Sequence, residues 1–284
     1  MCTYDKVPLL LKYVNGNDYR LLVDEYHNLL KQYMFRSKAI NGVLDNFRKF
    51  KSFCFMSATS IDSELKPDVL KGIPEYVADW KEEQILSITP LKTNKPYQYV
   101  VNFILYYKMN GFITVNGQIS KEAYFFLNSV TEIANIIKRC GLSNKNCRVI
   151  CANENKNRKK LGDILISNSV SETKQFNFIT CKSFEGADFF SESGLCFVVS
   201  NVNITHTLAS IDIDIPQIAG RIRNKENPFR NTLVHIFNTK NDDLFKSYEQ
   251  VKKCIESFIY GVNTPSRWGT QAPFSNITFT NPQS

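Results

Sequence analysis

Two adjacent acids, Asp24 and Glu25, directly follow the short apolar run of residues 21–23. A buried parallel strand delivers polar residues to the carboxyl edge of its sheet in this way. Carboxylates at such an edge supply the hard oxygen ligands that Mg²⁺ prefers, and one of them can take a proton from water. An ordinary acidic pair at a strand–loop junction has the same local pattern, so these acids alone do not define a site.

Residues 217–223, Gln-Ile-Ala-Gly-Arg-Ile-Arg, offer basic groups suited to phosphate. A guanidinium is permanently charged and its planar fork matches phosphate oxygens. Arg221 or Arg223 could therefore neutralise charge that develops on a γ-phosphate during its transfer. The competing interpretation is the basic start of a surface helix.

Residues 183–188, Ser-Phe-Glu-Gly-Ala-Asp, follow a predicted strand that ends at Thr180. Gly186 would let the backbone approach a ligand closely. Asp188 offers a carboxylate to a ribose or to an arginine. Taken alone, this segment is more typical of a simple turn between a strand and a helix.

Alternating apolar strands and amphipathic helices must position these groups, and they predict an α/β fold. Asn116-Gly117 predicts a tight hairpin turn, and Ser129 with Glu132 has the spacing of a helix capping box. The predicted strands are residues 21–23, 53–56, 112–115, 118–120, 123–127, 148–151, 176–180, 196–200 and 233–237, and the predicted helices are 37–50, 96–109, 129–140 and 244–260.

Net charge is +8, from 35 Lys and Arg against 27 Asp and Glu, with a pI near 9.0. Such a surplus favours an acidic partner such as nucleic acid, and it is equally typical of a protein from a basic proteome. The basic run of residues 156–160 predicts a solvated loop, with contact to a nucleic-acid backbone as the alternative.

The eight cysteines include no C-x-x-C pair, and there are only three histidines, so a Cys/His metal site is not expected. Buried thiols in a reducing cytosol are the better interpretation. No apolar run approaches the roughly 20 residues that span a bilayer, and the first residues lack a signal-peptide pattern. The sequence therefore predicts a soluble, cytoplasmic protein with no membrane partner.

Four segments occur in one order along the chain: residues 23–27 (Val-Asp-Glu-Tyr-His), residues 57–59 (Ser-Ala-Thr), residues 183–188 and residues 217–223. This order resembles that of the superfamily 2 DExH-box helicases, which are ATP-driven nucleic-acid motors. The D-E-Y-H and G-R-I-R segments resemble the origin-binding or phage replication type. The resemblance implies ATP and Mg²⁺ as cofactors, nucleic acid (DNA rather than RNA) as the track, other replication proteins as partners, and a viral or phage protein within a host cell.

The resemblance also implies two RecA-like parallel-sheet lobes, the first incomplete and the second complete, with ATP bound between them. On this interpretation the first lobe covers residues 1–85, a linker residues 86–96, the second lobe residues 97–240, a C-terminal helix residues 241–261 and a flexible tail residues 262–284.

The resemblance assigns roles residue by residue. Asp24 would hold Mg²⁺ through water, and Glu25 would orient and deprotonate the attacking water. The remaining assignments are catalysis by Gln217, Arg221 and Arg223, coupling by His27, Ser57 and Thr59, nucleotide binding by Gly186, Asp188 and Gly220, and nucleic-acid binding by Asn128, Ser129, Thr180 and Lys182. The family pattern is Q-x-x-G-R-x-x-R, but Asn224 stands at its second arginine, so either Arg221 or Arg223 would be the arginine finger.

The 284 residues contain no G-x-x-x-x-G-K-[ST] phosphate loop, the Walker A motif. We therefore expect an N-terminally incomplete motor that hydrolyses ATP weakly or not at all by itself. The main alternative is a non-catalytic, nucleic-acid-binding or regulatory remnant of a helicase. A motor that works beside a nuclease partner is a third interpretation.

Overall fold

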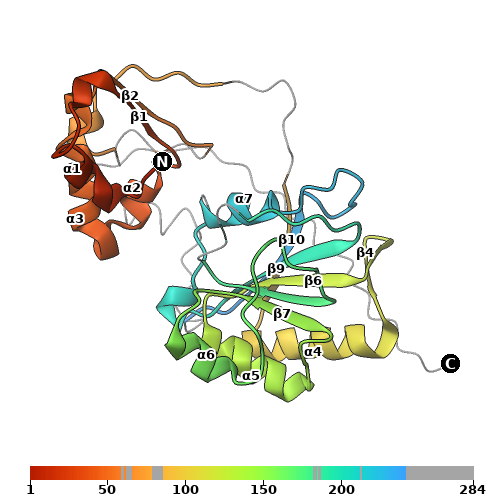
Figure 1. The fold of residues 1–284 in the computed structure, drawn as a ribbon. Helices are drawn as coiled ribbons and strands as arrows, with labels where there is room; N and C mark the ends of the chain where they lie inside the picture. Colours follow the sequence, from red (N-terminus) through yellow and green to blue (C-terminus); the bar gives the residue numbers. More distant parts are fainter. Residues whose placement is uncertain are drawn as a thin grey trace. The chain divides into compact units, whose positions relative to one another are not determined.

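The computed structural model describes residues 1–58, 61, 66–78, 86–181, 184, 187–211 and 213–240. The chain divides into two compact units, Met1–Glu82 and Glu83–Ser284, and each is described by itself (Figure 1).

The N-terminal unit is built on a pair of parallel strands, β1 (Arg20–Val23) and β2 (Ser52–Phe55), in which Val23 lies opposite Phe55. The predicted order of strand, helix and strand is confirmed. The helices between the strands are α2 (Asn28–Lys31), α3 (Tyr33–Leu44) and the 3₁₀ turn η3 (Phe47–Lys49). The other short helices of this unit are η1 (Tyr4–Lys6), α1 (Val7–Leu10), η2 (Gly16–Asp18) and η5 (Asp68–Leu70).

One face of the β1–β2 pair packs on the core of this unit. Val23 is buried with Val7, Val43 and Phe50, and a second cluster is centred on Phe47. On the other face the side chain of Leu22 is 60% exposed, and Cys54, its partner on β2, is also exposed. The described residues therefore cover this parallel sheet on one side, whereas most parallel sheets are covered on both.

The C-terminal unit contains a six-stranded, fully parallel sheet in the order β3-β10-β9-β6-β8-β7. A short antiparallel hairpin, β4 (Ile113–Val115) and β5 (Gln118–Ser120), turns at Asn116 and Gly117, which both have positive φ, as predicted. The strands of the large sheet are β3 (Ser87–Lys92), β6 (Glu122–Phe126), β7 (Cys147–Ile150), β8 (Phe176–Ile179), β9 (Gly194–Ser200) and β10 (Thr232–Phe237).

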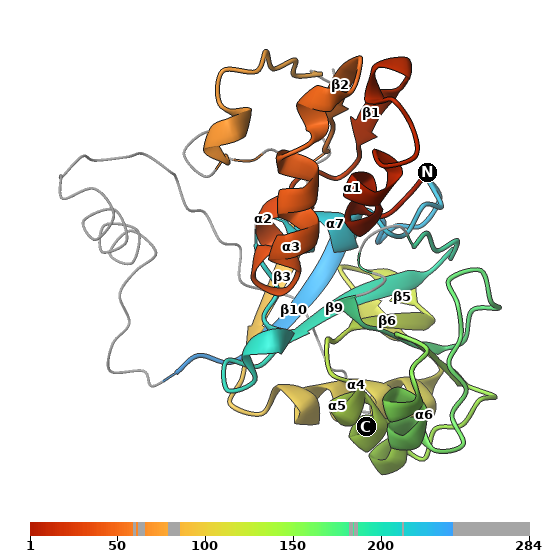
Figure 2. The ribbon, with the colours of Figure 1, turned by 60° about the vertical axis from the view of Figure 1, so that its left-hand side comes forward.

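Helices cover both faces of the large sheet (Figures 1 and 2). On one face α4 (Pro96–Asn110), α5 (Val130–Cys140) and α6 (Asn155–Leu161) bury strand residues such as Phe125. On the other face α7 (Asp214–Ala219) buries the alternate residues, such as Tyr124. A further 3₁₀ turn is η7 (Thr205–Thr207). The fold is mixed α/β with two parallel sheets, consistent with RecA-like lobes.

Helix α5 begins as predicted. The Ser129 hydroxyl accepts a hydrogen bond of 3.4 Å from the backbone N–H of Glu132, and Gly141 ends the helix with φ +56°.

The prediction of a linker at residues 86–96 was wrong, because this segment contains strand β3 and the start of α4. Pro90 lies in an edge strand, where a missing N–H costs least. Pro96 is the first residue of α4, in agreement with the helix predicted at residues 96–109.

The helix predicted at residues 37–50 ends earlier, at Leu44. The Asn46 side-chain amide donates a hydrogen bond of 2.8 Å to the Gly42 carbonyl and so competes with the backbone.

The basic run of residues 156–160 lies in helix α6 and not in a loop. The helix predicted at 244–260 and the tail lie outside the described residues. None of the described helices has the length and apolar character required to cross a membrane.

Candidate functional sites in the two units

In the N-terminal unit, the predicted catalytic acids and Ser57 lie at one edge of the sheet. Asp24 directly follows β1, and Ser57 follows β2 by two residues. Because the strands are parallel, both reach the carboxyl edge. The side chain of Asp24 is exposed there, whereas His27 is fully buried.

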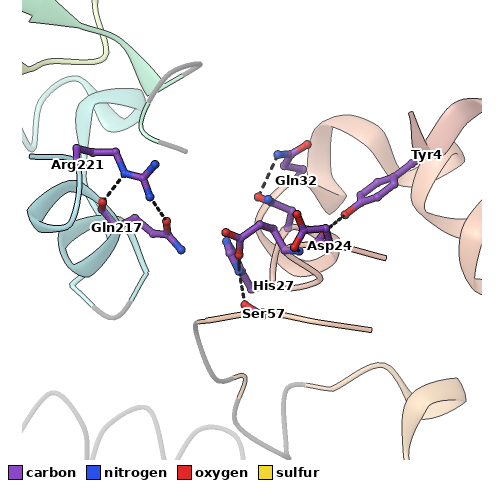
Figure 3. Close-up of polar contacts among 9 residues, drawn as sticks. Tyr4, Asp24, His27, Gln32, Ser57, Gln217 and Arg221 are labelled. Carbon is purple, nitrogen blue, oxygen red and sulfur yellow. Dashed lines mark hydrogen bonds and ion pairs between the residues drawn. The ribbon is translucent and has the colours of Figure 1, made fainter. Parts of the chain in front are cut away.

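The buried ring of His27 is hydrogen-bonded to Ser57 (Figure 3) and lies within ion-pair distance of Glu25. The His27 Nδ1 atom lies 2.7 Å from Ser57 Oγ and 3.2 Å from Glu25 Oε2. A ring nitrogen that lies between a carboxylate and a hydroxyl suits these two oxygens best when it carries the ring hydrogen and acts as the donor. The arrangement therefore fixes the orientation of the Glu25 carboxylate through a buried imidazole, and it links β1 to the segment after β2.

Glu25 has a left-handed backbone with φ +50°, which is uncommon for a residue with a side chain. Its N–H bonds Asp24 Oδ1 at 3.0 Å, and the Tyr4 hydroxyl donates to the Asp24 carbonyl at 3.1 Å (Figure 3). Such local strain is often stored at functional sites. Here it turns the two acids out of the strand direction.

A polar row on the helices beside these acids was missed from the sequence. Gln32 donates to Asn28 Oδ1 at 3.1 Å, and Arg36 donates to Gln32 Oε1 at 3.0 Å. The Arg36 guanidinium also lies over the ring of Tyr4. The four-residue spacing of Asn28, Gln32 and Arg36 was a usable signal, since such residues share one helix face.

The acidic pair fits a Mg²⁺ ion only together with other ligands. No group of three His, Cys, Asp or Glu side chains in the described part of the chain could hold a metal ion. Mg²⁺ commonly takes one or two carboxylates and fills its remaining positions with water and phosphate oxygens. The exposed Asp24 carboxylate is suited to that mode of binding.

In the C-terminal unit, Gln217 and Arg221 are bonded to each other (Figure 3). Arg221 Nε donates to the Gln217 carbonyl at 2.8 Å and Nη2 donates to Gln217 Oε1 at 3.1 Å. Nη1 reaches the Ala187 carbonyl at 3.4 Å. Arg221 is buried, so its guanidinium holds the end of α7 to the segment of residues 187–189.

Arg223 is the exposed arginine of the pair, and its Nε donates to Asp188 Oδ1 at 2.7 Å. The backbone brings these residues together: Phe189 N–H bonds the Arg221 carbonyl at 2.8 Å, and Arg223 N–H bonds the Phe189 carbonyl at 2.9 Å. Two segments that the sequence singled out separately are thus joined by a short parallel bridge.

Gly220 ends α7 with φ −78°, and a Cβ atom built there would meet no atom closer than 3.7 Å. This chain therefore does not itself require a glycine at residue 220, and the nucleotide-binding role of Gly220 stays a prediction. Three other predicted residues, Thr59, Lys182 and Gly186, lie outside the described residues.

The predicted nucleic-acid contacts Asn128, Ser129 and Thr180 lie together at the carboxyl edge of the large sheet. Asn128 Nδ2 donates to the His206 carbonyl at 2.7 Å, and Asn128 Oδ1 accepts from Cys181 N–H at 3.3 Å. Ser129 caps α5, and Thr180 is buried. Each side chain therefore supports the connections at this edge, and the predicted contact with nucleic acid stays untested.

His235, on β10, lies near the same edge and was not singled out from the sequence. Its Nε2 atom lies 3.1 Å from Ser200 Oγ on β9. Burial lowers the pKa of His235 to about 4, because a charged imidazole loses its hydration there. The ring is therefore neutral at pH 7.

A protein-family model described as "Anaerobic ribonucleoside-triphosphate reductase" matches residues 145–284. The match covers just under half of the chain and does not by itself place the protein in that family. No curated protein matches the sequence.

Among solved structures, the chain is similar to the Mycobacterium smegmatis helicase Lhr, solved with ssDNA and AMP-PNP, at 12% identity and a TM-score of 0.48. The alignment covers 84% of this chain and 31% of that chain, so this chain spans less than a third of the helicase.

Proposed function

We propose that this chain is part of a nucleic-acid-dependent, ATP-hydrolysing motor of the helicase or translocase type. The observation that carries the proposal is the orientation of Glu25 by His27, which contacts both Glu25 Oε2 and Ser57 Oγ. A carboxylate that is fixed at a sheet edge beside an exposed aspartate matches the need to position and deprotonate an attacking water.

In the N-terminal unit, Asp24 would bind the metal through water and Glu25 would accept the proton of the attacking water. Mg²⁺, when bound with the nucleotide, neutralises charge on the phosphate oxygens. His27 would favour one orientation of the Glu25 carboxylate through its contact with Oε2, and Ser57 would hold the His27 ring in place. Their bonds could also change when the nucleotide changes, which makes them candidates for coupling.

In the C-terminal unit, Arg223 is the better candidate for phosphate contact, and Arg221 is the better candidate for support. Arg221 is buried and bonds Gln217 and the Ala187 carbonyl, whereas the Arg223 guanidinium is exposed with Asp188 as its partner. An exposed ion pair is weak, so a phosphate can replace the carboxylate at little cost.

Nucleic acid, DNA in preference to RNA, is the proposed track. Its proposed position is the carboxyl edge that carries Asn128, Ser129 and Thr180. The side chains of Asn128 and Ser129 are engaged in the fold, so contact would come mainly from the connections that they hold in place.

A nucleotide test can detect the proposed metal site even if turnover is slow. Mn²⁺, which replaces Mg²⁺ and is visible by electron paramagnetic resonance, would be titrated into the chain with ATP. We expect ATP-dependent Mn²⁺ binding that weakens at least tenfold in Asp24→Asn and stays unchanged in Asp18→Asn, an exposed acid of the same unit. Equal binding in Asp24→Asn and the unchanged chain would contradict the proposal.

Hydrolysis is measured alongside as phosphate release with and without an oligonucleotide. The sequence contains no phosphate-loop motif, so we expect a weak rate that falls to background in Glu25→Gln. A strong, oligonucleotide-stimulated rate that Glu25→Gln abolishes would support the motor and overturn the expectation of weak turnover. Binding of oligonucleotide with no response to ATP would favour the non-catalytic helicase remnant.

The family match at residues 145–284 supplies a second candidate, a reductase acting on ribonucleoside triphosphates. ATP belongs to that class of ligand, so nucleotide binding alone does not separate the two. Anaerobic incubation with labelled ribonucleoside triphosphates distinguishes the motor from the reductase. Formation of deoxyribonucleotide would favour the reductase, and release of phosphate without it would favour the motor.

A further inference from the structure

One short stretch of this chain carries a large local surplus of positive charge. Residues 138–160 contain eight Lys and Arg and a single acid, Glu154. This stretch therefore carries seven of the eight net positive charges, and the rest of the chain is close to neutral. A uniformly basic proteome does not explain such a local surplus.

The stretch runs from the last turn of α5 through β7 to α6, and the two helices lie side by side on the same face of the sheet (Figures 1 and 2). Arg148 in β7 is buried. The other seven basic residues of the stretch are exposed, and Arg139 among them donates a hydrogen bond to Gln98. The remaining six form what we call the α6 basic surface: Lys138, Lys145, Lys156, Arg158, Lys159 and Lys160.

Three of these lysines share one face of α6. Lys156, Lys159 and Lys160 are spaced by three and four residues, whereas Asn157 and Leu161 point into the unit and are buried. Like charges at this spacing destabilise a helix. The last turn of a helix favours positive charge, so α6 can hold these lysines close together on its exposed face.

Little negative charge compensates this surface. Glu154 pairs with Lys156 at 2.8 Å, and Arg158 Nε donates to the neutral Asn153 side chain at 2.8 Å. Within the described part of the chain, no carboxylate forms an ion pair with Lys159 or Lys160, nor with Lys138 or Lys145. The positive charge is therefore available to an external polyanion.

We infer that the α6 basic surface binds the phosphate backbone of nucleic acid, separately from the predicted contacts at the carboxyl edge of the sheet. Nucleic acid carries a phosphate at every nucleotide, so several lysines on adjacent turns can each neutralise one. Flexible ammonium groups act as point charges and select no base. Binding at this surface requires no nucleotide, so the inference does not rest on the proposed function.

The test compares two triple variants of the full chain that change net charge equally. One is Lys156→Gln, Lys159→Gln, Lys160→Gln. The control, Lys95→Gln, Lys121→Gln, Lys240→Gln, replaces three exposed lysines of the same unit that lie outside this surface. Binding of a fluorescein-labelled 30-nucleotide oligo(dT) would be followed by anisotropy over a range of salt concentrations, without ATP.

We expect the α6 variant to bind about tenfold more weakly at low salt, and its log–log salt slope to fall by about two, because each lost phosphate contact removes roughly 0.7. The control should change the affinity less than about twofold. The α6 variant should also melt close to the unchanged chain, because all three replaced side chains are exposed. Equal binding by the two variants would overturn the inference.

The same variants would be mixed with phosphatidylserine vesicles. Stronger binding to vesicles than to oligo(dT), lost only in the α6 variant, would assign this surface to an anionic membrane and overturn the nucleic-acid inference. Weak vesicle binding that is equal in both variants would support it.

Discussion

Arg223 Nε and Arg221 Nη1 approach the same oxygen of Asp188, at 2.7 Å and 3.7 Å. The two arginines share this carboxylate but differ in how far their side chains are buried. The side chain of Arg221 is 9% exposed and that of Arg223 is 43% exposed. The two arginines that the sequence left as equal candidates are therefore distinguished by burial.

Replacing Arg221 should destabilise the C-terminal unit, whereas replacing Arg223 should not. Arg221→Gln removes bonds to two carbonyls and to Gln217, with an expected loss of about 2–4 kcal/mol of unfolding free energy. Arg223→Gln breaks a partly exposed pair and should cost about 0–1 kcal/mol. Urea unfolding of both variants, with Lys225→Gln as an exposed control, measures this. An equal loss in both would mean that Arg223 is also structural.

Replacing Glu25 with glycine should affect stability and activity differently. Glycine adopts the left-handed backbone at φ +50° more easily, so Glu25→Gly should leave the N-terminal unit equally stable or about 1 kcal/mol more stable. The same change removes the carboxylate and should abolish any residual ATP hydrolysis. Thermal unfolding and phosphate release, compared with those of Glu25→Gln, test both halves. A clearly less stable Glu25→Gly would show that the bond to His27 outweighs the strain.

His235 should make the C-terminal unit less stable in mild acid. Its pKa is lowered to about 4 in the fold, from near 6.5 in the unfolded chain. Between these values the unfolded chain binds a proton that the folded chain does not, so stability falls as the pH is lowered from about 6.5 towards 4. Below about 4 both states are charged and this contribution is constant.

Hydrogen–deuterium exchange of peptides from β9 and β10, measured at several pH values, follows this effect. His235→Gln should flatten the pH dependence in that window, because glutamine does not titrate. An unchanged dependence would assign the acid sensitivity to other groups.

The cysteines should differ in their rate of reaction with N-ethylmaleimide. Cys2, Cys54 and Cys181 are exposed, whereas Cys140, Cys147, Cys151 and Cys196 are buried. Burial raises the pKa of Cys147 to about 11 and that of Cys196 to about 12, so little thiolate forms. With N-ethylmaleimide at pH 8, peptide mapping should show Cys54 modified about a hundredfold faster than Cys147. Similar rates would indicate that the sheet opens readily.

Much of the fold followed from local sequence signals. The apolar runs located β1, β2, β6, β7, β8, β9 and β10 to within one or two residues, because strands of parallel sheets are rich in apolar residues. Ser129 and the Asn116-Gly117 turn were readable because each satisfies a requirement of its own backbone. The strand that contains Pro90 was not predicted, because proline is tolerated there only at an edge position, which is a property of the whole sheet.

The candidate sites were less readable than the fold. The residue types at Asp24, Glu25 and Arg221 were visible, but their environments were not. Nothing local shows that Arg221 is buried, that Glu25 has positive φ, or that His27 lies between two oxygens. These facts arise from residues that are distant in sequence. The positive charge of residues 156–160 was visible in the sequence. The common helix face of Lys156, Lys159 and Lys160 became apparent only from the structure, in which this segment is helical.

The backbone bridge between Phe189 and Ile222 has a mechanical consequence. Its two hydrogen bonds fasten the carbonyl of Arg221 and the N–H of Arg223 to one residue of the other segment. We expect a ligand that displaces the Asp188 carboxylate to displace the end of α7 as well, because the backbones of the two segments are joined at this bridge. Arg221 and Arg223 would then move together.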